Sequence, residues 1–103
     1  MSVLVEFAMF PTDKGESASP YVSRIIQMIS QSGIPYKLTP MGTVFETDDM
    51  HIALDLIEKS YMLLQPDCNR VYSTVKFDIR KNVENCMEKK IKSIENKIGK
   101  INT

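Results

Sequence analysis

An alternating stretch between Arg70 and Ile79 constrains the fold of this chain more than any other feature. Its polar side chains are Tyr72, Thr74, Lys76 and Asp78, and the residues of the other parity are Val71, Ser73, Val75, Phe77 and Ile79. Strand side chains point to alternate faces of a sheet, so this pattern predicts a strand with one core face and one polar face. Such a strand is typical of an antiparallel sheet covered on one side. The polar face is then either solvated or part of a ligand site.

The N-terminal third of the chain predicts a strand followed by a helix. Side chains alternate from Ser2 to Phe10, and Pro11 ends the run, which is the pattern of a first strand. After a polar loop, Ser19 is expected to be a helix N-cap with Pro20 at the first helical position, and Gly33 supplies a C-terminal stop. The apolar positions of this helix are Val22, Ile25, Ile26 and Ile29.

Two short strands and a second helix are predicted next. The strands cover residues 35–39 and 43–46, because the Pro40-Met41-Gly42 segment between them interrupts extended structure. Residues 47–49, which are Thr-Asp-Asp, supply capping oxygens and negative charge for a helix that ends before Pro66. The apolar stripe of this helix is Met50, Ala53, Leu54, Ile57, Tyr61 and Leu64.

A third helix is predicted after the long strand, and it carries a narrow apolar seam. The seam consists of Val83, Met87, Ile91, Ile94, Ile98 and Ile101, at spacings of four, four, three, four and three. Alternating spacings of three and four are typical of a helix that packs along another helix. The seam therefore fits either a helix of a second subunit or packing within its own domain.

The predicted element order is β-α-β-β-α-β with an added C-terminal helix. This order is that of an α+β, ferredoxin-like fold, in which two helices cover one face of an antiparallel sheet. At 103 residues the chain is expected to be a single domain over 1–103. The other sheet face then lacks a cover of its own. Phe10 and Phe45, expected on that face, favour burial by a ligand or a second subunit over full solvation.

Composition narrows the class of partner. Thirteen basic and thirteen acidic residues leave no net charge, so nucleic acid is not an expected partner. Cys68 and Cys86 lie far apart without a CxxC motif, and His51 is the only histidine, which does not favour a zinc site. No apolar run approaches the roughly twenty residues of a membrane span, and the N-terminus lacks the features of a signal peptide. We expect a cytoplasmic protein with free thiols.

Several polar residues have both a structural and a functional interpretation. Gly42 allows either a tight turn or a close approach of the backbone to a ring. Thr43 is an ordinary strand threonine or a ligand contact, and Glu46 is a ligand contact or a charge that stabilises the next helix N-terminus. Lys76 and Asp78 lie on one face of the long strand, where cross-strand ion pairs are the alternative to a ligand site.

In their order and spacing, the short motifs of this chain resemble those of the thiamine-binding protein family, small ferredoxin-like domains of the YkoF type. The motifs are Pro11 to Gly15, Ser19-Pro20-Tyr21-Val22, Gly33-Ile34-Pro35-Tyr36, Met41-Gly42-Thr43 followed by Glu46, and Arg70-Val71-Tyr72 leading to Lys76 and Asp78. The chain departs from the family at Thr12-Asp13-Lys14-Gly15-Glu16, where a glycine-rich loop is common, and at Asp78-Ile79-Arg80-Lys81, where an acidic pair often precedes two arginines. The resemblance implies binding without turnover of thiamine, or of its hydroxymethylpyrimidine portion, by a homodimer or homotetramer that needs no cofactor.

The chemistry of that ligand selects a set of side chains. A pyrimidine amine needs acceptors, ring nitrogens need donors, and a thiazolium cation is stabilised by carboxylates or aromatic faces. With the resemblance, these needs select Ser17, Ser19, Tyr21, Gly42, Thr43, Glu46, Lys76 and Asp78 as ligand-binding residues. We expect the pocket to lie between the sheet and the Pro11 to Ser19 loop.

Other functions are less well supported by the residues. The chain has no nucleophile elbow, no phosphate loop and no Cys-His or Ser-His constellation, so an enzyme is not favoured. The main rival is a structural or regulatory domain whose open sheet face is only an oligomer interface. A related rival is a small metabolic or metal-ion-responsive binder of the same fold.

Overall fold

The computed structural model describes residues 1–103, and its elements follow the predicted order. They are β1 (Ser2–Pro11), α1 (Ser19–Gln31), β2 (Tyr36–Thr39), β3 (Gly42–Thr47), α2 (Met50–Leu64), β4 (Val71–Arg80) and α3 (Cys86–Ile98). The four strands form one antiparallel sheet in the order β2-β3-β1-β4. The prediction of an α+β, ferredoxin-like fold with an added C-terminal helix is therefore confirmed.

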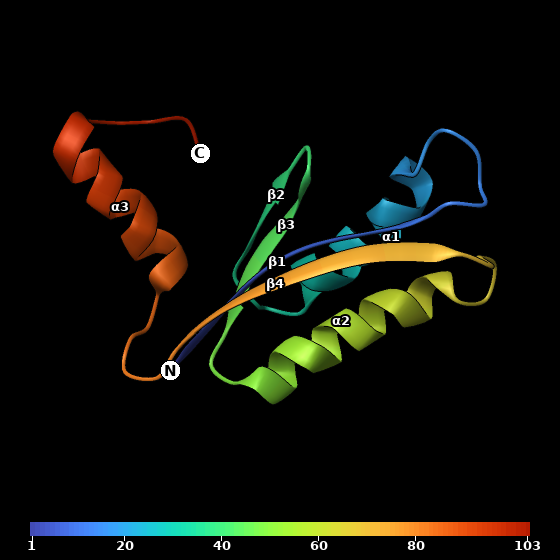
Figure 1. The fold of residues 1–103 in the computed structure, drawn as a ribbon, viewed down its shortest axis with the longest axis horizontal. Coiled ribbons are helices and arrows are strands. Elements are labelled where there is room, and N and C mark those ends of the chain that lie inside the picture. The colour runs from blue at the N-terminus through green and yellow to red at the C-terminus, as the bar shows by residue number, and fades with distance from the viewer.

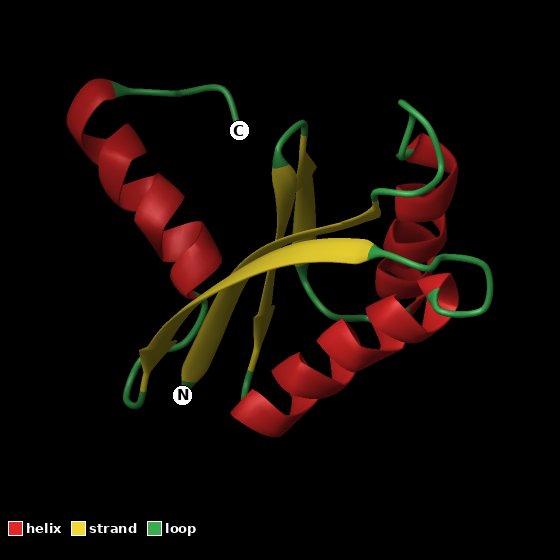
Figure 2. Cartoon of the chain, turned by 45° about the vertical axis from the view of Figure 1, so that its right-hand side comes forward, coloured by secondary structure: helices red, strands yellow, loops and turns green.

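The helices lie on opposite sides of the sheet. Figure 1 shows α1 and α2 together on one side, while α3 stands on the other side and contacts only one end of the sheet. Figure 2 shows the same layers after rotation, with α3 separated from the two covering helices by the strands. We call the side that faces α3 the open face. Most of the open face is not covered by any helix.

The register of the sheet confirms the predicted faces of β4. Phe77 pairs with the buried Val5, whereas Lys76 pairs with Glu6, so successive β4 side chains alternate between the helix side and the open face. Phe45, expected on the open face, instead lies in the core, where its ring meets the ring of Phe7 edge-on at 5.6 Å. The earlier expectation was wrong because Phe45 pairs with Val5 and shares its helix-side parity.

The helix termini follow the sequence with one exception. Asp49 caps α2, since its carboxylate accepts a hydrogen bond from the amide of Ile52 at 2.7 Å. Gly33 has a positive φ of 80° just beyond α1, as a C-terminal stop requires. The prediction that Ser19 is an N-cap was wrong, because Ala18 occupies that position and Ser19 is the first helical residue. The backbone carbonyl of Ala18, rather than a side chain, accepts from the first turn.

α2 is rotated slightly from its predicted orientation. Leu56 is 3% exposed and Ser60 is fully buried, whereas Leu54 is 49% exposed and Tyr61 also reaches solvent. Ser60 tolerates burial because its hydroxyl donates to the carbonyl of Leu56 at 2.8 Å. Counting apolar positions did not predict the buried face of α2, because that face includes the polar residue Ser60. Contacts with both α1 and β1 fix the rotation.

Candidate ligand-binding site

A cavity of about 300 Å³ lies where the β2–β3 hairpin meets the N-terminal half of α1. We call it the hairpin cavity. Most of its wall is apolar, and the remaining lining comes from hairpin backbone and hydroxyls. The lining residues are Phe7 to Phe10 of β1, Ala18, Val22, Ile25 and Ile26 of the loop and α1, and Leu38 to Thr43 of the hairpin. A flat apolar group with a few polar edges fits this wall.

The hairpin cavity lies along a free backbone edge. The ladder between β1 and β3 ends at the pair Phe7–Thr43, whereas β1 continues to Pro11. Side chains of both faces of β1 line the cavity, Phe7 and Met9 from the helix side and Ala8 and Phe10 from the open-face side. The cavity therefore wraps around the edge of β1 that β3 no longer covers. A strand edge presents alternating N–H donors and C=O acceptors.

Gly42 and Thr43 place the hairpin against this edge. A Cβ atom on Gly42 would lie 3.0 Å from the backbone oxygen of Phe7, so glycine permits the close approach of β3 to β1. Thr43 is 5% exposed and lines the cavity. The Thr43 hydroxyl makes no hydrogen bond within the protein. Every fully buried polar side-chain atom does make one, so the Thr43 hydroxyl oxygen is not fully buried. The hydroxyl therefore still reaches the space inside the cavity.

The loop before α1 is held to the far end of the sheet. The amide of Thr12 donates to the carbonyl of Arg70 at 2.8 Å, and the carboxylate of Asp13 accepts from the amide of Asn69 at 2.8 Å. The Asn69 hydrogen bond is the main reason that the pKa of Asp13 lies below its ordinary value. Ser17 and Ser19 are exposed and flank Ala18, which lines the hairpin cavity. Neither serine lines the cavity itself.

Tyr21 belongs to a different cluster. The guanidinium of Arg24 lies 4.9 Å from the centre of the Tyr21 ring and makes two hydrogen bonds of 2.9 Å to the carboxylate of Asp67. Arg24 also donates to the carbonyl of Leu63. These contacts join α1 to the end of α2. The side-chain hydrogen bond to Asp67 raises the pKa of Arg24, and the same bond lowers the pKa of Asp67.

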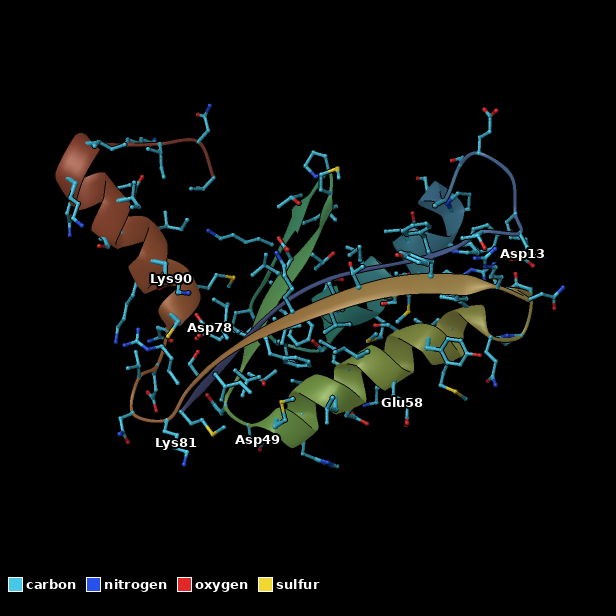
Figure 3. All side chains as sticks on the ribbon, in the orientation of Figure 1. Asp13, Asp49, Glu58, Asp78, Lys81 and Lys90 are labelled. Carbon is cyan, nitrogen blue, oxygen red and sulfur yellow. The ribbon has the colours of Figure 1, made fainter.

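Lys76 and Asp78 lie on the open face, and each has an ionic partner. Lys76 pairs across the strands with Glu6 at 2.7 Å, as the ion-pair interpretation predicted. Asp78 pairs instead with Lys90 of α3, and Figure 3 shows these two side chains side by side. The hydrogen bond and charge of Lys90 hold the pKa of Asp78 below its usual range. Asp78 stands opposite Leu4, near the other end of β1 from the hairpin cavity.

Glu46 caps α3, a role that its sequence neighbours did not suggest. Asn85, the residue at the N-cap position, has a left-handed backbone and makes no side-chain cap. The Glu46 carboxylate accepts from the amides of Cys86 and Met87 at 2.7 and 3.2 Å, and from the hydroxyl of Ser2. Burial raises the pKa of Glu46, but these hydrogen bonds outweigh it and hold the pKa below its ordinary value. Glu46 therefore acts forty residues away from the helix that it stabilises.

The structure thus divides the predicted site residues into three groups. Gly42 and Thr43 line the hairpin cavity, and Ser17 and Ser19 flank its lining residue Ala18 along the chain. Tyr21 joins the Arg24 cluster, and the remaining three lie on the open face near α3: Glu46, Lys76 and Asp78. One small molecule within a single subunit cannot contact all three groups. The cavity walls that sequence reasoning missed include Met9 and Phe10 of β1 and Leu38 and Met41 of the hairpin, whose only sequence signal is their apolar character.

Two further classes of site were sought. No three side chains among His, Cys, Asp and Glu come together as metal ligands. None of the helices has the length and apolar character needed to cross a lipid bilayer.

Comparison with known proteins places these features in a family. The family model described as thiamine-binding protein matches residues 5–95. A UPF0045 protein of Methanocaldococcus jannaschii is 34% identical over 92 residues, which cover 89% of this chain and 91% of the relative. A UPF0045 protein of Mycobacterium tuberculosis is 30% identical and covers 92% of this chain and 93% of the relative.

Solved structures agree with the fold. The crystal structure of the same Methanocaldococcus jannaschii protein superposes with a TM-score of 0.81 at 33% identity, covering 90% of this chain and 95% of that one. A candidate thiamine biosynthesis or salvage protein of Thermotoga maritima superposes with a TM-score of 0.76 at 20% identity, covering 90% and 99%. At that identity the Thermotoga likeness shows the fold alone.

Proposed function

Because the chain belongs to the thiamine-binding protein family, we propose that it binds thiamine, or the hydroxymethylpyrimidine portion of thiamine, in the hairpin cavity. The observation that supports this most is an apolar cavity at a free strand edge, with the available hydroxyl of Thr43 in its wall. An aminopyrimidine is flat and carries a donor and acceptors along its rim. These groups match the alternating donors and acceptors of the β1 edge beyond Phe7.

The rest of the ligand would lie toward the mouth of the cavity. The ring of Phe10 lines the cavity and lies 6.0 Å from the ring of Tyr72, so an aromatic pair stands beside this space. A thiazolium cation is stabilised by such faces. We assign Ser17 and Ser19, which flank the wall at Ala18, to the hydroxyethyl or phosphate end of the ligand. The proposed role is delivery, salvage or sensing in the cytoplasm, without turnover.

Calorimetric titration with thiamine, thiamine phosphates and hydroxymethylpyrimidine tests this proposal. Thr43→Val keeps the shape of the side chain but removes one hydrogen bond of about 1 kcal/mol, so the Kd should rise about fivefold. Val22→Phe places a ring in the hairpin cavity and should abolish binding. Thr74→Val, on the exposed face of β4, is the matched control and should bind as the wild type does.

The outcomes separate the proposal from its rival. If thiamine compounds bind but neither Thr43→Val nor Val22→Phe changes the affinity, the ligand lies elsewhere, and the open face becomes the first place to look. If none of the compounds binds at millimolar concentration, the structural or regulatory domain is favoured. That rival draws on the open face, where Leu4 and Val44 border a shallow depression that a second subunit could cover. We propose homo-oligomerisation in either case, because Leu4, Phe10 and Val44 of this face stay partly exposed in the single subunit.

A further inference from the structure

The apolar seam of α3 is mostly uncovered in the subunit. Cys86 and Met87 are buried against the sheet, but Ile94 is 45% exposed and Ile98 is 72% exposed. Figures 1 and 2 show why: α3 leaves the sheet after its first turn and projects away from it. Exposed isoleucines at helical spacing form a stripe that its own domain does not bury.

The helix is anchored firmly where it begins. The Glu46 carboxylate binds the amides of Cys86 and Met87, and Lys90 pairs with Asp78 on β4. A helix of 13 residues is marginal by itself. With its first turn fixed on the sheet, α3 presents the stripe in one direction. The stripe is therefore a preformed surface.

Charges flank the stripe in an ordered way. In heptad notation Ile91 and Ile98 occupy a positions, and Met87 and Ile94 occupy d positions, whereas Ile101, the next d position of the predicted seam, lies beyond the end of the helix. One flank, the g positions, carries lysine, and the other flank, the e positions, carries glutamate. The flanking residues are Lys90 and Lys97 at g, and Glu88 and Glu95 at e. The two flanks of the stripe thus have opposite charge.

This pattern distinguishes the possible occupants. In a parallel pair of helices a g residue faces the e residue of the following heptad on the partner, so lysine meets glutamate. In an antiparallel pair g meets g and e meets e, so like charges meet. An anionic membrane surface favours basic residues around the apolar stripe, and the glutamates of the e flank oppose it. Of these occupants, only a parallel helix places opposite charges beside both the lysine flank and the glutamate flank.

We propose that α3 of a second copy of this chain packs on α3 in parallel, with Lys90 of each copy beside Glu95 of the other. Lys90 already contacts Asp78, but an ammonium group has three donors and can bridge both carboxylates. Isoleucine at both a and d allows more than two parallel helices to associate, and the same lysine–glutamate contacts recur between neighbours in such a bundle. This contact is independent of ligand binding in the hairpin cavity.

Sedimentation equilibrium of charge variants of the full chain tests the proposal. Glu95→Lys replaces attraction by repulsion at both symmetric contacts, so the dissociation constant of the assembly should rise about tenfold. In an Asp78→Asn background, which removes the carboxylate that Lys90→Glu would otherwise face, the double variant Lys90→Glu with Glu95→Lys exchanges the charges and should restore association to within about threefold of Asp78→Asn alone. Asp78→Asn controls for the ion pair that the double variant also loses. Lys92→Glu, at a b position outside the stripe, controls for net charge and should have no effect.

Cross-linking reports the orientation. Parallel packing brings residue 98 of one copy beside residue 98 of the other, so Ile98→Cys should form a disulfide-linked dimer under mild oxidation. Asn96→Cys, on the far side of the helix, should not. Circular dichroism checks that each variant keeps its helices. A monomeric wild type, an unchanged dissociation constant for Glu95→Lys, failure of the double variant to match Asp78→Asn or better, or no Ile98→Cys dimer would each overturn the proposal.

Discussion

The substitution Glu46→Gln separates the two roles that the sequence allowed for this residue. In the structure the carboxylate accepts the amide hydrogens of Cys86 and Met87 and the hydroxyl hydrogen of Ser2. Glutamine keeps the shape of the side chain but replaces one acceptor oxygen by an NH₂ donor. Because all three partners are donors, that NH₂ group must face a donor, and at least one hydrogen bond is lost.

The expected loss is about 2 to 3 kcal/mol, the usual contribution of a hydrogen bond to a charged group. This loss acts first on α3, because the helix makes few other contacts with the sheet and its remaining ion pair, Lys90 to Asp78, is exposed. The opening equilibrium of α3 should therefore shift by about 30- to 150-fold. The core around Val5 and Phe45 should keep its stability, since it lies on the other face of the sheet.

Native-state hydrogen exchange measures this shift residue by residue. In Glu46→Gln the amides of α3, from Cys86 through Glu95, should exchange about 30- to 150-fold faster than in the wild type, and those of β1 and β3 should not change. Thiamine binding in the hairpin cavity should also be unchanged, because Thr43 and Glu46 point to opposite faces of β3.

Glu88→Gln is the matched control. It removes the same charge from the first turn of α3 without removing a hydrogen bond from Glu46, so its effect should be limited to about 0.3 to 1 kcal/mol from the helix dipole. If Glu46→Gln leaves exchange in α3 as it was but weakens thiamine binding, Glu46 is a ligand contact and the assignment of the hairpin cavity is wrong.

Three further outcomes are expected. Since the pKa of Glu46 is lowered in the folded protein, its stabilisation of α3 is complete above its ordinary pKa of 4.5 and is lost as the pH falls through the lower folded-state value. The helical circular dichroism of the wild type should fall in that window. Glu46→Gln should show a smaller fall, because only the Asp78–Lys90 pair is then lost in acid. Gly42→Ala should lower the free energy of unfolding by about 1 to 3 kcal/mol in urea, because its Cβ meets the Phe7 oxygen at 3.0 Å, and an unchanged midpoint would show that the hairpin moves aside freely. Leu56→Ala should cost about 2 to 5 kcal/mol and Leu54→Ala less than about 0.5, whereas equal losses would contradict the rotation of α2 seen here.

Local sequence rules predicted most of the backbone. Alternation in β1 and β4, a capping oxygen within residues 47–49 and the Gly33 stop were all correct, because each depends on residues within one element. The local rules failed where contacts elsewhere in the structure took the place of the expected local one. Ser19 was expected to cap α1, but the backbone of Ala18 took that place. The stripe of α2 was misjudged because Ser60 is buried with its hydrogen bond satisfied inside the helix.

The candidate site was predictable only in part. Gly42 and Thr43 were correctly expected beside the hairpin turn, but Glu46 was grouped with Thr43 as one site. Their separation by three positions along one strand already implies opposite faces, so the sequence contained this correction. The cavity itself was not predictable, because it exists where β1 extends past the end of β3, and strand lengths in different parts of the chain decide that.

The sequence alone determined which elements form, the alternation of the two long strands β1 and β4, and which family the motifs resemble. These properties follow from the period of the side chains and from capping groups within a few residues. Only the tertiary structure decided that the strand order is β2-β3-β1-β4, that Glu46 caps a helix forty residues away, and that the stripe of α3 leaves its own sheet. The physical reason is that these contacts join residues distant in the chain. Their geometry is fixed by packing of the whole sheet rather than by any local preference.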